Sequence, residues 1–218
     1  MRLESDRMHV FSSALLVVSL FTTQLLAEPK PAETFDFESL EVGTEPEGTM
    51  VLDGTVTVGL RDGTKVLLFG PAPLTETALQ LGSSARGTQR VHAKVRAEKK
   101  RRSAPRFAVG VHGISGYRIR LSPAAGKIEL VRNEEVVEAK DFEWESGEVY
   151  HMEVSAVQSE DESWKVEARA WKDGTERPAE ALFSAAPAKM SGQGKASLYA
   201  TPFSGSAIEF DDVEVSFE

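Results

Sequence analysis

The 218-residue chain contains no cysteine. This absence excludes disulfide bonds, a thiolate zinc site and a lipid-anchored cysteine. It does not exclude export, because a chain of this length can bury a sufficient core without covalent cross-links. Hydrophobic residues make up 41% of the sequence, which is enough for such a core.

Positive charge is also in short supply. The chain has 25 Lys and Arg residues against 34 Asp and Glu residues, which gives a formal net charge of -9 at pH 7. A protein that binds phosphate backbones normally carries net positive charge. Nucleic acid is therefore not an expected partner.

Long apolar runs are scarce, and the one clear case lies at residues 10–26. It is short for a membrane span and contains Thr22, Thr23 and Gln24. It resembles the apolar part of a secretory signal peptide, so we interpret residues 1–27 as a signal peptide cleaved after Ala27. The alternative is an uncleaved anchor. After cleavage no transmembrane anchor remains, and the expected location is periplasmic or extracellular.

Common catalytic signatures are missing as well. The sequence has no Ser-His-Asp signature, no phosphate-cradling glycine loop and no nucleophile elbow. The spacing of His92, His112 and His151 matches no zinc-ligand motif. The sequence therefore does not predict an enzyme.

What the sequence does contain is alternation of apolar and polar residues, most clearly between residues 116 and 174. Tyr117, Ile119 and Leu121, for example, alternate with Arg118 and Arg120. This is the period of a strand with one buried face, and no segment shows a sustained helical period.

After a proline-rich lead-in at residues 28–33, about a dozen such segments fill residues 34–218. This number exceeds the seven to nine strands of an immunoglobulin domain. It predicts an all-β domain, a two-sheet antiparallel β-sandwich of the jelly-roll type, over residues 34–218.

Turn signals and the chain ends add three expectations about the topology. Asp53-Gly54 and Asp62-Gly63 are typical of hairpin turns. Residues 34–39 and 207–217 are expected to lie side by side in one sheet, because jelly rolls usually bring both ends to one edge. Residues 177–190 are expected to form a connection without a long helix, because they contain two prolines.

Several segments in order resemble the concanavalin A-like lectin and glucanase jelly roll, including its laminin-G-like members. They are Phe-Asp-Phe-Glu at 35–38, Gly-Tyr at 116–117, residues 126–132, residues 147–154, residues 164–174 and Phe-Asp-Asp-Val-Glu-Val at 210–215. The resemblance implies two curved antiparallel sheets and often glycan binding on the concave face or its rim. Such domains also include enzymes and purely structural modules, so the fold alone does not select a function.

One segment resembles a catalytic motif of that group. Residues 209–214 match the Glu-x-Asp-x-x-Glu motif of laminarinase-type glucanases, in which paired carboxylates cleave a glycosidic bond. In those enzymes the motif lies in the middle of the chain, whereas here it lies on the last predicted strand. We interpret it as part of a solvated terminal strand.

The polar faces of the strands supply the candidate ligand-binding residues. Arginine provides planar hydrogen-bond donors for sugar oxygens, and an exposed tryptophan provides an apolar platform for a sugar ring. The alternative is a solvent face of cross-strand charge pairs. Some of these residues are expected to share one sheet face, and Arg118, Arg120, Arg169 and Trp171 are expected to form its concave surface. The candidates are Arg118, Arg120, Arg169, Trp171, His112 and Glu153.

Carboxylates on the first and last strands suggest a calcium site. If those strands pair, oxygen ligands gather as calcium requires. The alternative is that they are ordinary edge carboxylates, which also prevent edge-to-edge aggregation. The four residues are Asp36, Glu38, Asp211 and Asp212, and no other cofactor is expected.

The sequence thus predicts an exported, non-catalytic, lectin-like module that binds a polysaccharide or other glycan. A structural or protein-interaction β-sandwich of the cell envelope is the alternative. A glycoside hydrolase or related sugar-active enzyme is the third hypothesis.

Overall fold

The computed structural model describes residues 31–71, 75–190, 192–203 and 205–217. The predicted signal peptide at residues 1–27 and the first half of the proline-rich lead-in lie outside the described residues. Within the described ranges no helix has the length and apolar character needed to cross a membrane.

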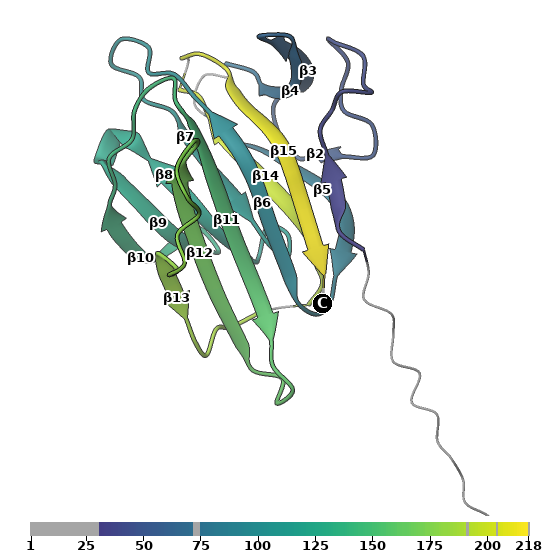
Figure 1. Ribbon diagram of the computed structural model, residues 1–218, viewed down its shortest axis with the longest axis vertical. Coiled ribbons are helices and arrows are strands. Elements are labelled where there is room, and N and C mark those ends of the chain that lie inside the picture. Colours follow the sequence, from purple (N-terminus) through teal and green to yellow (C-terminus); the bar gives the residue numbers. More distant parts are fainter. Residues whose placement is uncertain (1–30, 72–74, 191, 204, 218) are drawn as a thin grey trace, which may run out of the picture.

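The described chain forms two antiparallel sheets that pack face to face (Figure 1). One sheet has eight strands, in the order β13-β12-β11-β6-β15-β4-β3, with β1 also paired to β15. Their bounds are β1 (Glu33–Phe35), β3 (Val56–Arg61), β4 (Thr64–Phe69), β6 (Gln89–Arg96), β11 (Val149–Gln158), β12 (Trp164–Lys172), β13 (Phe183–Ala185) and β15 (Ile208–Phe217).

The other sheet has seven strands, in the order β10-β9-β8-β7-β14-β5-β2. The only helix of the described residues is a single 3-10 turn, η1 (Pro123–Ala125). The prediction of an all-β, two-sheet sandwich is therefore confirmed. The bounds are β2 (Met50–Val51), β5 (Thr77–Ala85), β7 (Arg106–Gly110), β8 (Tyr117–Ser122), β9 (Lys127–Arg132), β10 (Glu135–Asp141) and β14 (Gly194–Thr201).

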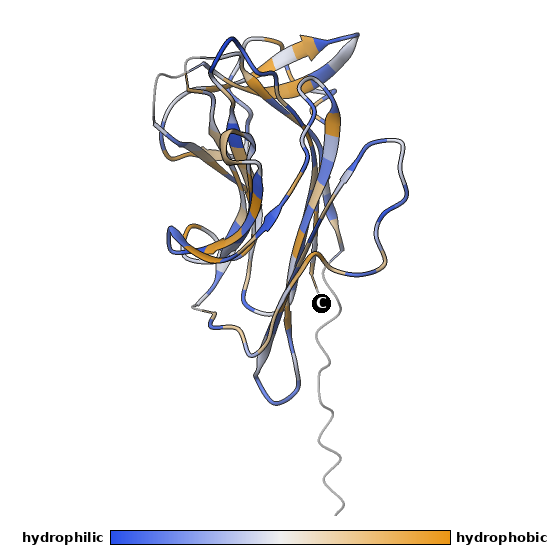
Figure 2. Ribbon diagram, turned by 90° about the vertical axis from the view of Figure 1, so that its left-hand side faces the viewer, coloured by the Kyte–Doolittle hydropathy of each residue, from blue (hydrophilic) through white to orange (hydrophobic). Residues whose placement is uncertain are grey.

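The core lies between the sheets and is built by the alternation seen in the sequence (Figure 2). Val91 and Val95 of β6 and Ile119 of β8 are fully or almost fully buried. Phe69 and Phe210 contact each other with ring centroids 5.0 Å apart. Each fully buried side chain of this size contributes about 1.5–3 kcal/mol relative to an exposed one. The same alternation turns the polar residues of each strand to an outer face.

Pairing of the two chain ends is confirmed, because Thr34 of β1 lies opposite Glu214 of β15. The hairpin at Asp62-Gly63 is also confirmed. Arg61 pairs with Thr64, and both turn residues have positive φ, as a two-residue hairpin turn requires.

The predicted hairpin at Asp53-Gly54 is wrong. The strand before it, β2, pairs with β5 of the seven-stranded sheet, whereas the strand after it, β3, pairs with β4 of the eight-stranded sheet. The turn therefore carries the chain from one sheet to the other. Strand β13 was not predicted from the sequence, because it lies within the proline- and alanine-rich connection.

A β-bulge in β15 decides which carboxylates reach the outer face. Asp212 has a φ of 44°, and the pairing with β6 shifts register between Asp211 and Glu214. As a result, Asp211 lies opposite Lys94 and Glu214 lies opposite His92. The extra residue brings Glu214 to the same outer face as Asp211, which strict alternation would not.

Candidate functional site

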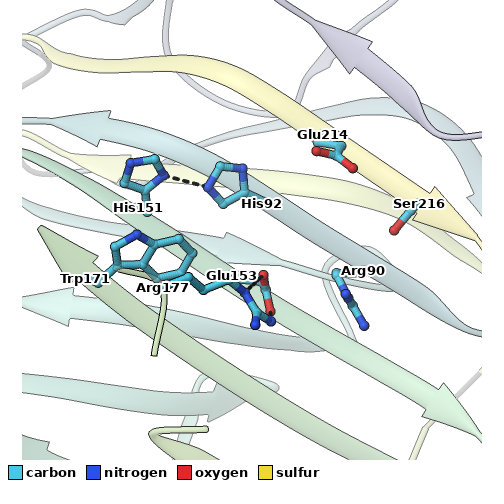
Figure 3. A pocket seen from close by; sticks show the side chains of 8 residues that line it. All are labelled: Arg90, His92, His151, Glu153, Trp171, Arg177, Glu214 and Ser216. Carbon is cyan, nitrogen blue, oxygen red and sulfur yellow. Dashed lines mark hydrogen bonds and ion pairs between the residues drawn. The ribbon is translucent and has the colours of Figure 1, made fainter. Parts of the chain in front are cut away.

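The outer face of the eight-stranded sheet carries a cavity of about 320 Å³, which we call the Trp171 cavity (Figure 3). Its walls come from the neighbouring strands β15, β6, β11 and β12 and from the connection that follows β12. The lining residues are Arg90, His92, His151, Glu153, Trp171, Arg177, Glu214 and Ser216.

Strand register brings these side chains together from distant parts of the chain. Glu153 on β11 lies opposite His92 on β6, which lies opposite Glu214 on β15. His151 on β11 lies opposite Trp171 on β12. Directly opposed side chains on one sheet face stand about 4.5–5.5 Å apart at their Cβ atoms, so they form one continuous surface.

Glu153 is the electrostatic centre of the cavity and is only 5% exposed. Arg177 donates to both of its carboxylate oxygens, at 2.9 and 2.5 Å, and Arg169 donates to one of them at 3.3 Å. Burial alone would raise the pKa of Glu153, but the Arg177 hydrogen bonds and the charges of Arg177, Arg90 and Arg169 outweigh it and lower the pKa. Glu153 is therefore an ionised anchor, and Arg177 ties the connection after β12 to the sheet.

Three aromatic rings stack along one wall. Trp171 and His151 are nearly parallel, at 4° and a centroid distance of 4.8 Å, and His92 stacks on His151 at 5.1 Å. His92 Nε2 and His151 Nδ1 are 2.9 Å apart, and His151 Nε2 lies 2.7 Å from Asp173 Oδ1. The stack fixes the orientation of the indole beside the cavity (Figure 3).

Hydrogen bonding along this stack orients both imidazole rings. The carboxylate of Asp173 only accepts, so His151 donates to it from Nε2. His92 Nε2 and His151 Nδ1 share one hydrogen bond, in which the nitrogen that carries the proton is the donor.

Acidification should destabilise the fold through His92. Burial first, and then the neighbouring His151, lower its pKa from 6.5 to about 4. Between these two values the unfolded chain binds a proton that the folded chain does not, so stability falls as pH falls from 6.5 towards about 4. We expect a loss of about 1–2 kcal/mol from this group once solvent screening is allowed for. Urea denaturation at several pH values in this range measures the free energy of unfolding, which should depend less steeply on pH in His92→Gln than in the wild type. The same pH dependence in both proteins would contradict a lowered pKa of His92.

Another wall of the cavity holds polar side chains whose hydrogen-bonding groups are available to a ligand. Within the described residues, the side chains of Arg90, Glu214 and Ser216 make no hydrogen bond to another protein group, although the charge of Arg90 acts on Glu153. Figure 3 shows these three residues on the side of the cavity away from Trp171 and His151, with Glu214 next to His92. They can donate to and accept from a ligand without breaking an existing hydrogen bond.

Asp211 lies on the same outer face, next to Lys94 on β6. Burial first, and then the charge of Asp212, raise its pKa from 3.8 to about 6. Its Oδ1 accepts a hydrogen bond from the backbone N–H of Asp212 at 2.8 Å. Asp211 therefore carries its charge above about pH 6 in an environment that disfavours it.

Asp211→Asn should stabilise the protein at neutral and alkaline pH. Asparagine keeps the oxygen that accepts from Asp212 but removes the disfavoured charge. We expect a gain of about 1 kcal/mol at about pH 8, after allowance for solvent screening, and no gain at about pH 4, where the folded carboxyl is already protonated. Urea denaturation at the two pH values measures the difference; a destabilised variant at the higher pH would contradict the prediction.

Two of the predicted ligand-binding residues, Glu153 and Trp171, line the Trp171 cavity, and Arg169 lies beside them on Glu153. Arg118 and Arg120 do not. They lie on β8 in the seven-stranded sheet, so they project from the opposite outer face of the sandwich. The hypothesis that Arg118 and Arg120 form one concave surface with Arg169 and Trp171 is wrong, because alternation separates inward from outward residues but does not say to which sheet a strand belongs.

Arg118 and Arg120 are instead held by their own sheet. Arg118 donates to Glu76 at 2.8 Å and to Glu134 at 2.6 Å. Its guanidinium carbon also stands 4.3 Å from the centroid of the Tyr199 ring. Arg120 donates to Glu129 at 2.8 Å, and the two arginines are 4% and 8% exposed. These contacts fit the cross-strand charge pairs that were the alternative interpretation.

His112 lies in the connection between β7 and β8, away from both sheet faces. It is 2% exposed, and its ring stands edge-on to Trp164 at 5.2 Å. Burial lowers its pKa, against the opposing effect of backbone groups of Gly87 and Gly192. It is a neutral, packed side chain and contributes nothing to the Trp171 cavity.

The four carboxylates predicted to bind calcium do not come together as a metal site. Among the described residues, no three His, Asp or Glu side chains are placed to hold a metal ion. Asp36 accepts from the backbone of Glu38, and Glu38 accepts from the backbone of Lys65. Asp212 forms an ion pair with Lys94 at 2.8 Å. Pairing of the first and last strands is thus correct, but their carboxylates are used locally.

The remaining cavity residues were not selected from the sequence. Arg90, His92 and His151 follow from alternation, since each occupies a polar position of its strand. Glu214 and Ser216 alternate with the apolar Val213, Val215 and Phe217, but the bulge in β15 is needed to place them on the same face as Asp211. Arg177 lies outside any strand, so no periodic signal identifies it.

Comparison with solved structures finds the same two-sheet architecture in several proteins. Carbohydrate binding module CBM66 from Bacillus subtilis superposes with a TM-score of 0.54 at 12% identity, over 78% of this chain and 95% of that one. Lectin II from Ulex europaeus gives 0.54 at 10% identity, over 86% and 98%. The potassium-bound carbohydrate recognition domain of Emp46p gives 0.54 at 10% identity, over 78% and 88%.

The chain has the concanavalin A-like jelly-roll fold that these lectins and carbohydrate-binding modules share. No protein-family model matches the sequence, and no curated protein matches it either. At this level of identity the likeness establishes the fold alone.

Proposed function

We propose that this protein is a non-catalytic, lectin-like module that binds a glycan in the Trp171 cavity. The observation that carries the proposal is the pairing of a fixed indole with the hydrogen-bonding groups of Arg90, Glu214 and Ser216 across one cavity. The fold shared with carbohydrate-binding modules and lectins supports the same proposal.

The chemistry of the cavity suits a sugar. A pyranose or furanose ring has apolar C–H faces and a rim of hydroxyl groups that both donate and accept hydrogen bonds. Trp171 supplies an apolar surface, and the cavity offers donors and acceptors of both charges. Ligand sites of this kind combine an apolar lining with a few placed polar groups.

We further propose that the protein acts outside the cytoplasm, in the periplasm or extracellular space, after removal of residues 1–27. The basis is the apolar segment at residues 10–26, followed by Ala27 and a proline-rich stretch. Amino-terminal sequencing of the protein recovered from its native cells tests this directly, with a new terminus at Glu28 as the expected result.

A glycan screen tests the proposed function. The purified protein should bind at least one polysaccharide on a panel of neutral and acidic glycans. A variant with both Arg90→Ala and Glu214→Ala should lose that binding with an unchanged thermal unfolding curve. The matched control is Lys127→Ala with Asp141→Ala, which removes a cation and a carboxylate from the other sheet. Failure of the wild type to bind any member of a broad panel would count against the proposal.

One observation favours protein interaction as a second candidate. The edge strand β10 is exposed along its whole length, and Val136 and Val137 are 47% and 50% exposed. An exposed apolar edge strand is a template for pairing with another chain. Binding of a protein partner that Val136→Lys abolishes, with glycan binding absent, would select this function instead.

The glucanase-like motif supports a hydrolase less well. Glu209, Asp211 and Glu214 do reach the same outer face, because of the bulge in β15. Glu209, however, is ion-paired with Arg61 and lies 3.7 Å from Arg96. If the protein released reducing ends from the bound polysaccharide and Glu214→Gln abolished this release, the protein would be a hydrolase rather than a non-catalytic module.

A further inference from the structure

The Trp171 cavity does not stand alone on its sheet face. A second cavity, of about 200 Å³, lies over the bulge of β15 and is lined partly by His92, Lys94 and Glu214. A third, of about 180 Å³, includes Lys94, Arg96, Val149 and Asp211 in its lining. We call them the bulge cavity and the distal cavity.

Shared walls connect the three cavities into a row. His92 and Glu214 line both the Trp171 cavity and the bulge cavity, and Lys94 lines both the bulge cavity and the distal cavity. All three follow the outward residues of β6 from Arg90 to Arg96. The six residue-to-residue steps from Arg90 to Arg96 span about 20 Å, which is longer than a single sugar ring.

The side chains that line this row carry more negative than positive charge. Five cationic side chains and seven carboxylates line the three cavities. Lys94 is paired with Asp212 at 2.8 Å, Arg96 with Glu98 at 2.8 Å, and Arg177 with Glu153. An acidic glycan would meet excess negative charge, because most of the cations already have an anionic partner.

We propose that the three cavities form one groove that binds an internal stretch of an extended, neutral glycan along β6. This inference rests on the proposed function and adds the length and charge class of the ligand. The Trp171 cavity holds one end of the bound stretch. The bulge and distal cavities hold the following rings through the polar groups of Lys94, Arg96 and Asp211.

The geometry makes a specific demand on ligand length. A disaccharide fills only part of a groove of about 20 Å, whereas a hexasaccharide reaches the distal cavity. Each added ring brings further contacts while most of the entropic cost of association has already been met. Affinity should therefore rise by about tenfold or more from disaccharide to hexasaccharide.

Blocking the distal cavity distinguishes binding along the whole groove from binding in the Trp171 cavity alone. Val149 occupies an outward position of β11 in the distal cavity, and Val149→Trp would fill that cavity. The variant should bind the hexasaccharide only as weakly as the disaccharide, while its affinity for the disaccharide is unchanged. The matched control is Val136→Trp on the edge strand β10, which makes the same change on the other sheet.

The experiment is isothermal titration of wild type and both variants with di-, tetra- and hexasaccharides of β-1,3-glucan, β-1,4-glucan, β-2,6-fructan and polygalacturonate. The expected result is length-dependent binding of a neutral series that Val149→Trp removes and Val136→Trp leaves intact. Equal affinity for short and long oligosaccharides, or a preference for polygalacturonate, would overturn the groove while leaving glycan binding in place. Absence of binding to every series would overturn both. Thermal unfolding of Val149→Trp, expected to match wild type, shows that the variant is folded.

Discussion

Replacing Glu153 by alanine is expected to lower the free energy of unfolding by about 3 kcal/mol, because it removes one partner of a buried charge network. Arg169, 8% exposed, would lose an anionic partner and keep only Glu167 and a backbone carbonyl. Arg177 would lose both of its hydrogen bonds to the sheet. Urea denaturation at neutral pH measures the change.

Two variants make that result interpretable. Glu160→Ala removes a carboxylate from an exposed turn and should change stability by less than about 0.5 kcal/mol. Glu153→Gln keeps an acceptor for the arginines and should lie between wild type and Glu153→Ala. If Glu153→Ala and Glu160→Ala had the same effect, Glu153 would not be the anchor of the cavity.

Replacing Trp171 by alanine is expected to weaken glycan binding by about tenfold to a hundredfold, which corresponds to roughly 1.4–2.8 kcal/mol. The substitution removes the apolar wall of the cavity and the stacking partner of His151. Stability should change little by comparison, because Trp171 lies on an outer face rather than in the core between the sheets. Titration calorimetry with the bound oligosaccharide measures the loss.

Trp171→Phe provides the matched comparison for this prediction. Phenylalanine retains a planar apolar ring, so it should recover most of the affinity that alanine loses. Wild-type affinity in Trp171→Ala would show that the indole does not contact the sugar. Equal losses in both variants would indicate that the indole N–H, rather than the ring face, is what matters.

Much of the fold could be predicted from the sequence because its signals are local. Alternation along β6, β8, β11 and β12 correctly separates core residues from outward ones. The Asp-Gly dipeptide at residues 62–63 specifies a tight turn by its backbone requirements alone. The pairing of β1 with β15 followed from a general property of jelly rolls and is confirmed.

The membership of strands in sheets is not a local property, and the errors lie there. Arg118 and Trp171 both occupy outward positions, yet their strands belong to different sheets. The Asp53-Gly54 turn has the composition of a hairpin but connects the two layers. Which strands become neighbours depends on long-range packing, and alternation does not encode it.

The candidate site was predicted in part for the same reason. Glu153 and Trp171 were chosen from strand periodicity, and the structure brings them together because β11 and β12 are adjacent. Glu214 reaches the cavity only through a bulge, and Arg177 only through a connection that folds back onto Glu153. The connection leaves no periodic trace in the sequence, and the bulge leaves only two consecutive polar residues, Asp211 and Asp212, where the alternation changes phase.

The most direct test of the account is a map of the bound glycan on the surface by nuclear magnetic resonance. Isotope-labelled protein would be titrated with the oligosaccharide that binds in the screen, and amide and indole shifts would be followed. If the glycan binds in the Trp171 cavity, the shifts gather on the outer face of β6, β11, β12 and β15, including the Trp171 indole. Shifts centred on Arg118 and Arg120 of β8, with the Trp171 signals unmoved, would contradict it.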